Sequence, residues 1–262
     1  MTAADGTYLD EILAHHRRLV AKDTRSLDDL IVEARAEVPP PRGFRAAIES
    51  DDGISIIAEI KRRSPSAGTL RAGIVAPSLA QAYEAGGATC LSVLTDERFF
   101  SGSEDDFDSA RNIVGIPALR KDFTVDARDV CDTRIMDGDA VLLIAAALSD
   151  DELADFHALT LDLGMDALVE VHDEAEVERA LAVGAMLIGV NQRDLVTFEV
   201  DGDRAERLVG QIPDGVVSVA ESGIRTADDT RRLRDAGYDA VLVGEVLVTS
   251  DDPLSAVMSL KP

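Results

Sequence analysis

Lysine is scarce in this chain, and its scarcity accompanies a large excess of acidic residues. The 262 residues carry 50 acidic and 26 basic side chains, which gives a formal net charge of −24. A nucleic-acid partner is therefore excluded, because a phosphate backbone requires a positive protein face. Only four lysines are present, and two of them, Lys61 and Lys121, lie away from the terminal regions and need an explanation.

Cysteine and long apolar runs are also lacking. Cys90 and Cys131 are too few and too isolated for a metal cluster, and we expect no disulfide framework. No run approaches the roughly 18 apolar residues of a membrane span, and the N-terminal segment lacks the pattern of a secretory signal. We therefore expect a protein of the reducing cytoplasm without a membrane partner. Aspartate supplies 33 of the 50 acids, a composition that resembles proteins of salt-loving microbes.

Short apolar runs rich in β-branched residues recur along the chain, with intervals long enough for a helix. Eight such strand–helix units predict a (β/α)8 TIM barrel, and an open doubly wound sheet is the alternative. No G-x-G-x-x-G follows the first run, which removes the dinucleotide-binding fingerprint. The expected strands are 54–60, 89–95, 117–120, 140–144, 167–171, 186–190, 216–220 and 240–244.

Helical apolar spacing fills several of the intervals, including 153–164, 174–185 and 227–237. Hydroxyl and carboxyl side chains stand where these helices begin, and glycines stand where helices end. The expected N-caps are Ser149, Asp173 and Thr226, and the expected left-handed glycines are Gly86, Gly138, Gly164, Gly184 and Gly237.

Residues 1–50 precede the first expected strand. They contain an amphipathic stretch at about 7–21, a second helical stretch at about 26–36 and three consecutive prolines. No low-complexity linker divides the chain. We therefore expect a single domain over 1–262, in which 1–50 form an N-terminal helical extension and 51–262 form the barrel.

Polar side chains lie at the carboxyl ends of six expected strands, where barrels of this kind carry their chemistry. Ionisable groups beside apolar strands are costly to bury unless they are paired or functional. A ring of salt bridges that closes the barrel mouth is the structural alternative for any single residue, but it explains the whole set poorly. The set is Glu59, Lys61 and Ser64, then Lys121, Glu170, Asn191, Arg193, Glu221, Ser222 and Glu245.

Two glycine-containing pairs follow the last two expected strands. Ser222-Gly223 and Gly244-Glu245 lie where barrels often bind phosphate through backbone N–H groups. Glycine at such a point permits close approach of a ligand to the backbone. Together the pairs predict a phosphate monoester as ligand, with the Glu245 side chain turned away from it.

The four histidines are expected to play structural roles. His15 and His16 lie on the polar N-terminal helix and His157 lies within a later helix, which favours solvated or packed imidazoles. His172 lies near the barrel mouth without an apparent partner, which favours a loop role. The aromatic pair 99–100 either covers an aromatic substrate or fills the core.

Eight segments together resemble the indole-3-glycerol-phosphate synthase family. They follow the family's order and spacing, and they extend from the first expected strand to the last. The segments are AEIKRRSPSAG (58–68), LTDERFFSGS (94–103), RKDF (120–123), AVLLIAAALSD (140–150), LVEVHDE (168–174), IGVNQRDL (188–195), AESGI (220–224) and VLVGE (241–245).

The resemblance implies closure of an indole ring. The substrate is 1-(2-carboxyphenylamino)-1-deoxyribulose 5-phosphate, the products are indole-3-glycerol phosphate, carbon dioxide and water, and the family uses no metal or organic cofactor. By motif, Lys121 matches the general acid at the substrate carbonyl, Glu170 matches the residue that removes a proton, and Glu59 and Lys61 match a pair that assists later proton transfers. The resemblance adds Asn191 and Ser222 to the catalytic set, and it implies substrate binding by Ser64, Phe100, Phe123, Leu142, Arg193, Glu221, Gly223, Gly244 and Glu245.

Elementary chemistry agrees with this assignment. A carbonyl oxygen under attack by an aromatic carbon must be protonated, and a lysine ammonium with a lowered pKa can supply the proton. We expect Lys61 to lie near Lys121 and to lower the pKa of both. One alternative is a phosphoribosylanthranilate isomerase, which would want a Cys/Asp acid–base pair at strand ends, and neither cysteine is suitably placed. The other is a non-catalytic barrel acting as a binding subunit, which predicts missing strand-end lysines or carboxylates.

Overall fold

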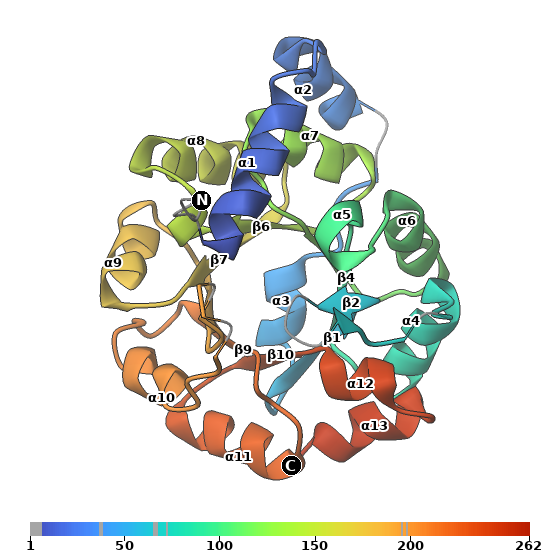
Figure 1. Ribbon diagram of the computed structural model, residues 1–262. Coiled ribbons are helices and arrows are strands. Elements are labelled where there is room, and N and C mark those ends of the chain that lie inside the picture. The colour runs from blue at the N-terminus through green and yellow to red at the C-terminus, as the bar shows by residue number, and fades with distance from the viewer. Residues whose placement is uncertain (1–6, 37–38, 65–67, 72, 195, 198) are drawn as a thin grey trace, which may run out of the picture.

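The computed structural model describes residues 7–36, 39–64, 68–71, 73–194, 196–197 and 199–262. Parallel strands close into a barrel in which neighbours follow chain order, and β10 pairs with β1 to complete the ring (Figure 1). This confirms the predicted (β/α)8 barrel and rules out the open sheet. The barrel strands are β1 (Ser55–Ile60), β4 (Cys90–Leu94), β5 (Ala118–Lys121), β6 (Ala140–Ile144), β7 (Asp166–Val171), β8 (Leu187–Asn191), β9 (Val217–Glu221) and β10 (Ala240–Val243).

The barrel strands other than β5 are buried along most of their length, because helices cover the outer face and side chains fill the inside, whereas β5 is fully buried only in its first half. This explains why the strands appear in the sequence as continuous apolar runs without alternation. The helices form a ring around the barrel in Figure 1. They are α4 (Ala76–Ala85), α6 (Glu104–Ile113), α7 (Ala127–Ile135), α8 (Asp150–Asp162), α9 (Glu174–Ala182), α10 (Arg204–Val209), α11 (Ala227–Ala236) and α13 (Pro253–Leu260).

The predicted N-caps are confirmed: Ser149, Asp173 and Thr226 each accept a hydrogen bond from a backbone N–H in the first turn of α8, α9 and α11. The glycines are confirmed only in part. Gly164, Gly184 and Gly237 have positive φ, but 86 and 138 do not, and their neighbours Gly87 and Asp137 take the left-handed conformation instead. A Cβ at position 86 would lie 2.6 Å from the Leu254 carbonyl oxygen, so that glycine serves close packing.

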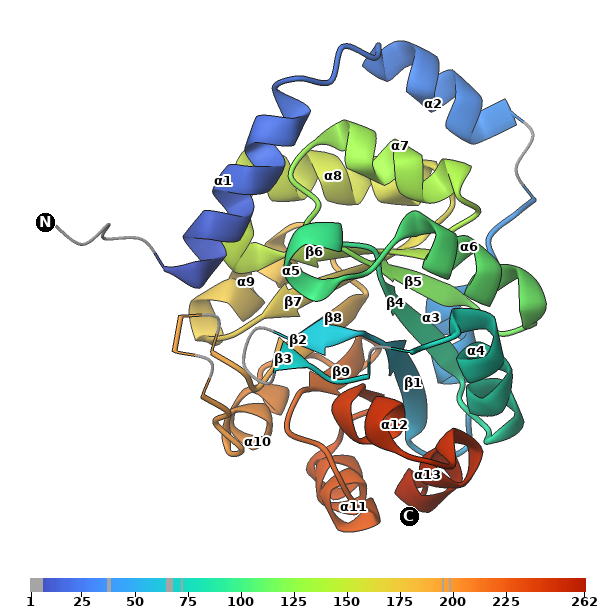
Figure 2. The same cartoon turned by 45° about the vertical axis from the view of Figure 1, so that its right-hand side comes forward.

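Two helices precede the barrel and lie against one side of it. Helices α1 (Tyr8–Val20) and α2 (Leu27–Ala36) follow the predicted stretches closely. Helix α2 lies beside α7, and Arg25 bonds Asp132 of α7 at 2.7 Å (Figure 2). Helix α1 crosses beside the barrel mouth, where Arg17 pairs with Glu152 of α8 at 2.8 Å.

A short helix that the sequence did not predict, α3 (Phe44–Glu49), covers the amino-terminal end of the barrel and is seen through it in Figure 1. Phe44 is fully buried there. The backbone N–H groups of Arg42 and Arg45 donate to Asp139 and Asp166, at 2.7 and 2.9 Å. Aspartates at strand starts therefore attach this helix to the barrel.

Smaller elements occupy the opposite, carboxyl-terminal end. They include the hairpin of β2 (Arg63–Ser64) and β3 (Gly68–Thr69), α5 (Glu97–Phe100), a 3₁₀ turn at Ala145–Ala147 and α12 (Glu245–Thr249). None of them was predicted, because elements of two to five residues carry too little periodicity. Within the described part of the chain, no helix has the length and apolar character needed to cross a membrane.

Candidate active site

The carboxyl ends of the strands converge on a cavity of about 130 Å³. All six residues predicted to be catalytic line it, so the structure brings them together from five strands. The cavity is lined by Glu59, Lys61, Ser64, Phe100, Lys121, Phe123, Leu142, Glu170, Asn191, Arg193, Glu221, Ser222 and Gly244, with Leu94, Asp122, Ile144 and Leu242.

Lys121 lies at the centre of the charged groups. Its Nζ donates to Glu221 Oε2 at 2.6 Å and to Glu170 Oε2 at 2.9 Å. Burial opposes the charge of this amine, but the carboxylates of Glu170, Glu221 and Glu59 outweigh burial and raise the pKa of Lys121 above its ordinary value. The predicted lowering of this pKa is therefore wrong, because three acids surround the ammonium.

The two carboxylates on Lys121 have different surroundings. Glu170 Oε1 also accepts a hydrogen bond from Asn191 Nδ2 at 2.9 Å, and although burial disfavours its charge, Lys121, His172 and Asn191 lower the pKa of Glu170 to about 2. Glu221 Oε1 is buried without a hydrogen-bond partner, and burial raises the pKa of Glu221 to about 7. The site thus holds one ionised acid and one acid that titrates near neutral pH.

The second lysine has its own carboxylate. Lys61 Nζ hydrogen-bonds Glu59 Oε1, two residues earlier at the same strand end. Space for Glu59 depends on glycine, because a Cβ at Gly244 would lie 2.4 Å from Glu59 Oε1. Likewise, a Cβ at Gly189 would lie 2.2 Å from Glu221 Oε1. The sequence analysis missed Gly189, although an isolated glycine inside a strand commonly marks close approach.

Asn191 and Ser222 form a network beside the acids. Ser222 Oγ donates to Asn191 Oδ1 at 2.8 Å, which directs the Asn191 amide toward Glu170. The backbone N–H of Arg193 donates to the same Oδ1 at 3.0 Å. Ser222 has a φ of 67°, a conformation that costs a non-glycine residue about 1–3 kcal/mol. Such strain is typical of functional sites and accords with a role in orienting substrate.

The cavity has an aromatic and aliphatic wall. Phe100 and Phe123 face each other with ring centroids 6.1 Å apart, and Leu142 lies on the same cavity. Phe99, its neighbour in α5, is buried against Tyr8 instead, with ring centroids 5.7 Å apart. The sequence left two roles possible for the aromatic pair 99–100, and each residue has one of them. Phe100 lines the cavity, and Phe99 packs in the interior.

A second hollow of about 50 Å³ adjoins the cavity and contains the two predicted phosphate-binding turns. Gly223 adopts a φ of 76°, and a Cβ there would lie 2.7 Å from Val200. The Glu245 carboxylate lies 3.8 Å from the Arg225 guanidinium, which offsets its charge. The lining residues are Arg193, Val200, Ser222, Gly223, Ile224, Arg225, Leu242, Val243, Gly244 and Glu245.

His172 has partners that the sequence did not reveal. Its Nδ1 lies 3.1 Å from Glu176 Oε2, and its Nε2 lies 3.5 Å from Glu170 Oε1. Burial alone would lower the pKa of His172, but the hydrogen bond to Glu176 and the charge of Glu170 raise it above its ordinary value. The expectation of a histidine without a partner is wrong, because one turn of α9 returns Glu176 to the strand end.

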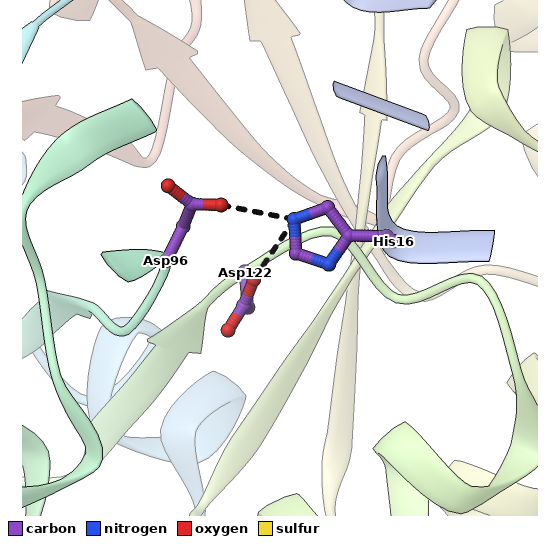
Figure 3. A group of neighbouring side chains, drawn as sticks. All are labelled: His16, Asp96 and Asp122. Carbon is purple, nitrogen blue, oxygen red and sulfur yellow. Dashed lines mark hydrogen bonds and ion pairs between the residues drawn. The ribbon is translucent and has the colours of Figure 1, made fainter. Parts of the chain in front are cut away.

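A wider hollow, of about 960 Å³, lies beside this site and not within it. It is lined mainly by charged residues of α1 and of the segments that follow β4 and β5, and it shares Asp122 and Phe123 with the cavity. His16 of α1 reaches into it toward Asp96 and Asp122 (Figure 3). One imidazole nitrogen and one oxygen of each carboxylate, all of them atoms of a kind that can bind a metal ion, lie within 4.8 Å of one another. Among the described residues, this is the one group of three or more such side chains.

Comparison with known proteins agrees with this geometry. Residues 9–260 match the family model described as indole-3-glycerol phosphate synthase. The chain is 47% identical to the indole-3-glycerol phosphate synthase of Mycobacteroides abscessus, over 98% of this chain and 94% of that protein. It is 49% identical to the one from Mycobacterium avium, over 97% and 93%. These relatives are mycobacterial, so the resemblance to proteins of salt-loving microbes receives no support from them.

A solved structure shares the fold at low identity. The thiamine phosphate pyrophosphorylase of Pyrococcus furiosus superposes with a TM-score of 0.60 at 16% identity, over 79% of this chain and 93% of that one. That likeness concerns the barrel alone. The family model and the relatives extend over nearly the whole chain, including every strand end that lines the cavity. The chain therefore belongs to the indole-3-glycerol phosphate synthase family.

Proposed function

We propose that this site converts 1-(2-carboxyphenylamino)-1-deoxyribulose 5-phosphate into indole-3-glycerol phosphate, carbon dioxide and water, as a carboxy-lyase of the cytoplasm. The observation that carries the assignment is Lys121, held between Glu170 and Glu221 at 2.9 and 2.6 Å beside an aromatic wall. The reaction needs an acid, a base and an apolar surface for the anthranilate ring within one cavity, and these residues supply all three.

The acid step falls to Lys121. The aromatic carbon that bears the carboxylate attacks the ketone, and Lys121 gives its proton to the carbonyl oxygen. A raised pKa keeps this amine charged at neutral pH, and it also makes the ammonium a weaker acid than an ordinary lysine. Glu221, 2.6 Å away and with a pKa of about 7, can return a proton to the amine. In this proposal, proton exchange between Glu221 and Lys121 supports the acid step. The sequence analysis had instead expected a lowered pKa of Lys121 to do so.

The later steps restore aromaticity. Carbon dioxide leaves from the attacking ring carbon. The hydroxyl on the former ketone carbon then leaves as water, while a proton is removed from the carbon between it and the nitrogen. Glu170 is the base, because Lys121 and Asn191 hold its carboxylate in the ionised form within the cavity. Lys61, paired with Glu59, stands on the other side of the cavity, where it can assist departure of the hydroxyl.

The remaining residues hold the substrate. Phe100, Phe123 and Leu142 receive the anthranilate ring, and Asn191 and Ser222 orient the chain between ring and phosphate. The phosphate occupies the hollow at Gly223 and Gly244, whose lining also includes Arg193 and Arg225, and arginine is well suited to bind phosphate. Ser64, Arg193, Glu221 and Glu245 border these two spaces.

The test is product formation from the named substrate, followed by the fluorescence of the indole product. Purified protein should give indole-3-glycerol phosphate and an equal amount of carbon dioxide. The matched variant Lys121→Met keeps the length of the side chain without its proton, so turnover should fall about 10²-fold or more while substrate binding persists. If Lys121→Met formed product at a rate within a few-fold of the parent, Lys121 would not be the general acid. No product from the parent would refute the proposed function.

A further inference from the structure

The candidate for a further role is His16, which the sequence analysis assigned to the polar face of the N-terminal helix. Its side chain is 15% exposed, and its Nε2 lies 2.9 Å from Asp96 Oδ2 and 4.0 Å from Asp122 Oδ1. Figure 3 shows the imidazole reaching from α1 toward both carboxylates, which come from two other parts of the chain. The contact thus joins α1 to the segments after β4 and β5.

Each carboxylate also holds the backbone of an aromatic residue of the cavity. Asp96 is the N-cap of α5, and its Oδ1 accepts from the N–H groups of Phe99 and Phe100, at 2.6 and 2.9 Å. Asp122 Oδ1 accepts from the N–H of Phe123 at 2.8 Å. The two acids that meet His16 are therefore the two that fix Phe100 and Phe123.

The imidazole also contacts the wall directly. Its ring centroid lies 5.4 Å from that of Phe123, whose other neighbour is Phe100 at 6.1 Å. We propose that His16 is a positioning residue for the aromatic wall, which it holds in place for the anthranilate ring through Asp96, Asp122 and the face of Phe123. This inference rests on the proposed function for its substrate, and on geometry alone for the restraint of the two phenylalanines.

The charge on His16 contributes to the restraint of the aromatic wall. Carboxylates of Asp96 after β4, Asp122 after β5 and Asp129 on α7 face it, while His15 on its own helix and Arg120, bonded to Asp122, are the nearby basic groups. Burial alone would lower the pKa of His16, but the bond to Asp96 and the charges of Asp122 and Asp129 raise it above its ordinary value. Stabilisation from His16 is therefore full below about pH 6.5 and is lost as pH rises through the raised pKa.

The experiment compares His16→Gln and His16→Phe with the parent and with His15→Gln as the matched control on the same helix. His16→Gln removes the charge, and His16→Phe keeps a ring against Phe123 without the hydrogen bond. In both, KM should rise about five- to tenfold while kcat stays within about twofold, because the wall binds the ring and does no proton transfer. The KM of the parent should climb toward that of His16→Gln as pH rises from 6 to 9. The control should keep the parent's KM and its pH dependence.

A second readout does not depend on turnover. Amide hydrogen exchange in 96–101 and 121–125 should accelerate in His16→Gln but not in His15→Gln, because Phe100 and Phe123 lose their fixed acceptors. If the parent formed no indole product, the proposed function would be refuted. The exchange measurement would still test whether His16 restrains the two phenylalanines. Unchanged exchange and unchanged KM in both His16 variants would overturn the proposal. An increase in KM after EDTA treatment of the parent would also overturn it, since the three side chains would then hold a cation.

Discussion

Buried carboxylates lie at both ends of this barrel, and the two groups do different things. At the amino-terminal end, Asp139 and Asp166 accept backbone N–H groups that fasten α3, and Arg111 pairs with Asp139 at 3.1 Å. At the carboxyl-terminal end, Glu170 and Glu221 share the ammonium of Lys121 inside a cavity.

The difference lies in the partners, since Asp139 is as deeply buried as Glu170 and Glu221. Both oxygens of Asp139 are occupied by fixed donors, because Oδ1 accepts from Arg42 N and Oδ2 accepts from Ala118 N, each at 2.7 Å. Glu221 has one oxygen on the Lys121 amine and the other without a hydrogen-bond partner. An acid saturated by backbone donors stabilises the fold, whereas an acid that shares a proton with a lysine can do chemistry.

The strongest way to break the carboxyl-terminal end without touching an ionisable group is Gly189→Ala. The new Cβ would lie 2.2 Å from Glu221 Oε1, so the carboxylate must move away from Lys121. We expect kcat to fall about hundredfold, the scale of a 1 Å misplacement, in an assay of indole formation. Gly210→Ala is the control, because a Cβ there meets no atom within 4 Å. Equal activity of the two variants would show that the position of Glu221 is unimportant.

At the opposite end, Asp139→Asn should change stability and spare activity. The amide has one acceptor oxygen where the carboxylate has two, and it removes one of the two carboxylates, Asp139 and Asp137, that pair with the buried Arg111 guanidinium. We expect the free energy of unfolding to fall by about 2 kcal/mol in a urea titration, with kcat within about twofold of the parent. A loss of kcat larger than the loss of stability would erase the distinction between the two ends.

The titration of Glu221 sharpens the comparison through pH. Its pKa of about 7 lies above the unfolded value, so its contribution to stability is full at low pH and is lost as pH rises through about 7. Glu221→Gln cannot ionise and should not suffer that loss. The Tm of the parent should therefore decline relative to that of Glu221→Gln between pH 5 and pH 8. Parallel Tm curves would place the titrating proton on another group.

Salt should have the smallest and most general effect, because it acts on the surface and not on either end. At a net charge of −24, repulsion reaches about 30 Å in 0.01 M salt and about 3 Å in 1 M salt. We expect Tm and activity both to rise between 0.1 M and about 2 M KCl. That outcome would indicate adaptation to salt. Constant values across the range would show that the acidic excess is incidental.

The sequence predicted the barrel well because its strands are buried on both faces. Apolar runs such as 140–144 and 216–220 coincide with β6 and β9 to within one residue. The strand ends were equally readable, since charged residues directly after apolar runs must meet at one edge. The sequence alone therefore predicts that Lys121, Glu170 and Glu221 lie at the barrel mouth.

Contacts between distant segments could not be predicted in this way. The raised pKa of Lys121 depends on which carboxylates surround it, and strand order alone does not give their distances. His16 and Asp96 are 80 positions apart, so no local pattern indicates that they meet. Helix α3 is too short for periodicity to identify, and its attachment depends on Asp139 and Asp166.

Closure of the barrel by β1 and β10 also sets when the site becomes complete during synthesis. Ser55 pairs with Ala240, and Glu59 of β1 occupies space that Gly244 leaves open directly after β10. While β10 is still inside the ribosome, one edge of β1 in the nascent chain is unpaired and one wall of the phosphate hollow is missing. Catalysis is therefore the last property that the growing chain acquires. Two separately produced pieces, divided before β10, would each be inactive and would become active only when they associate.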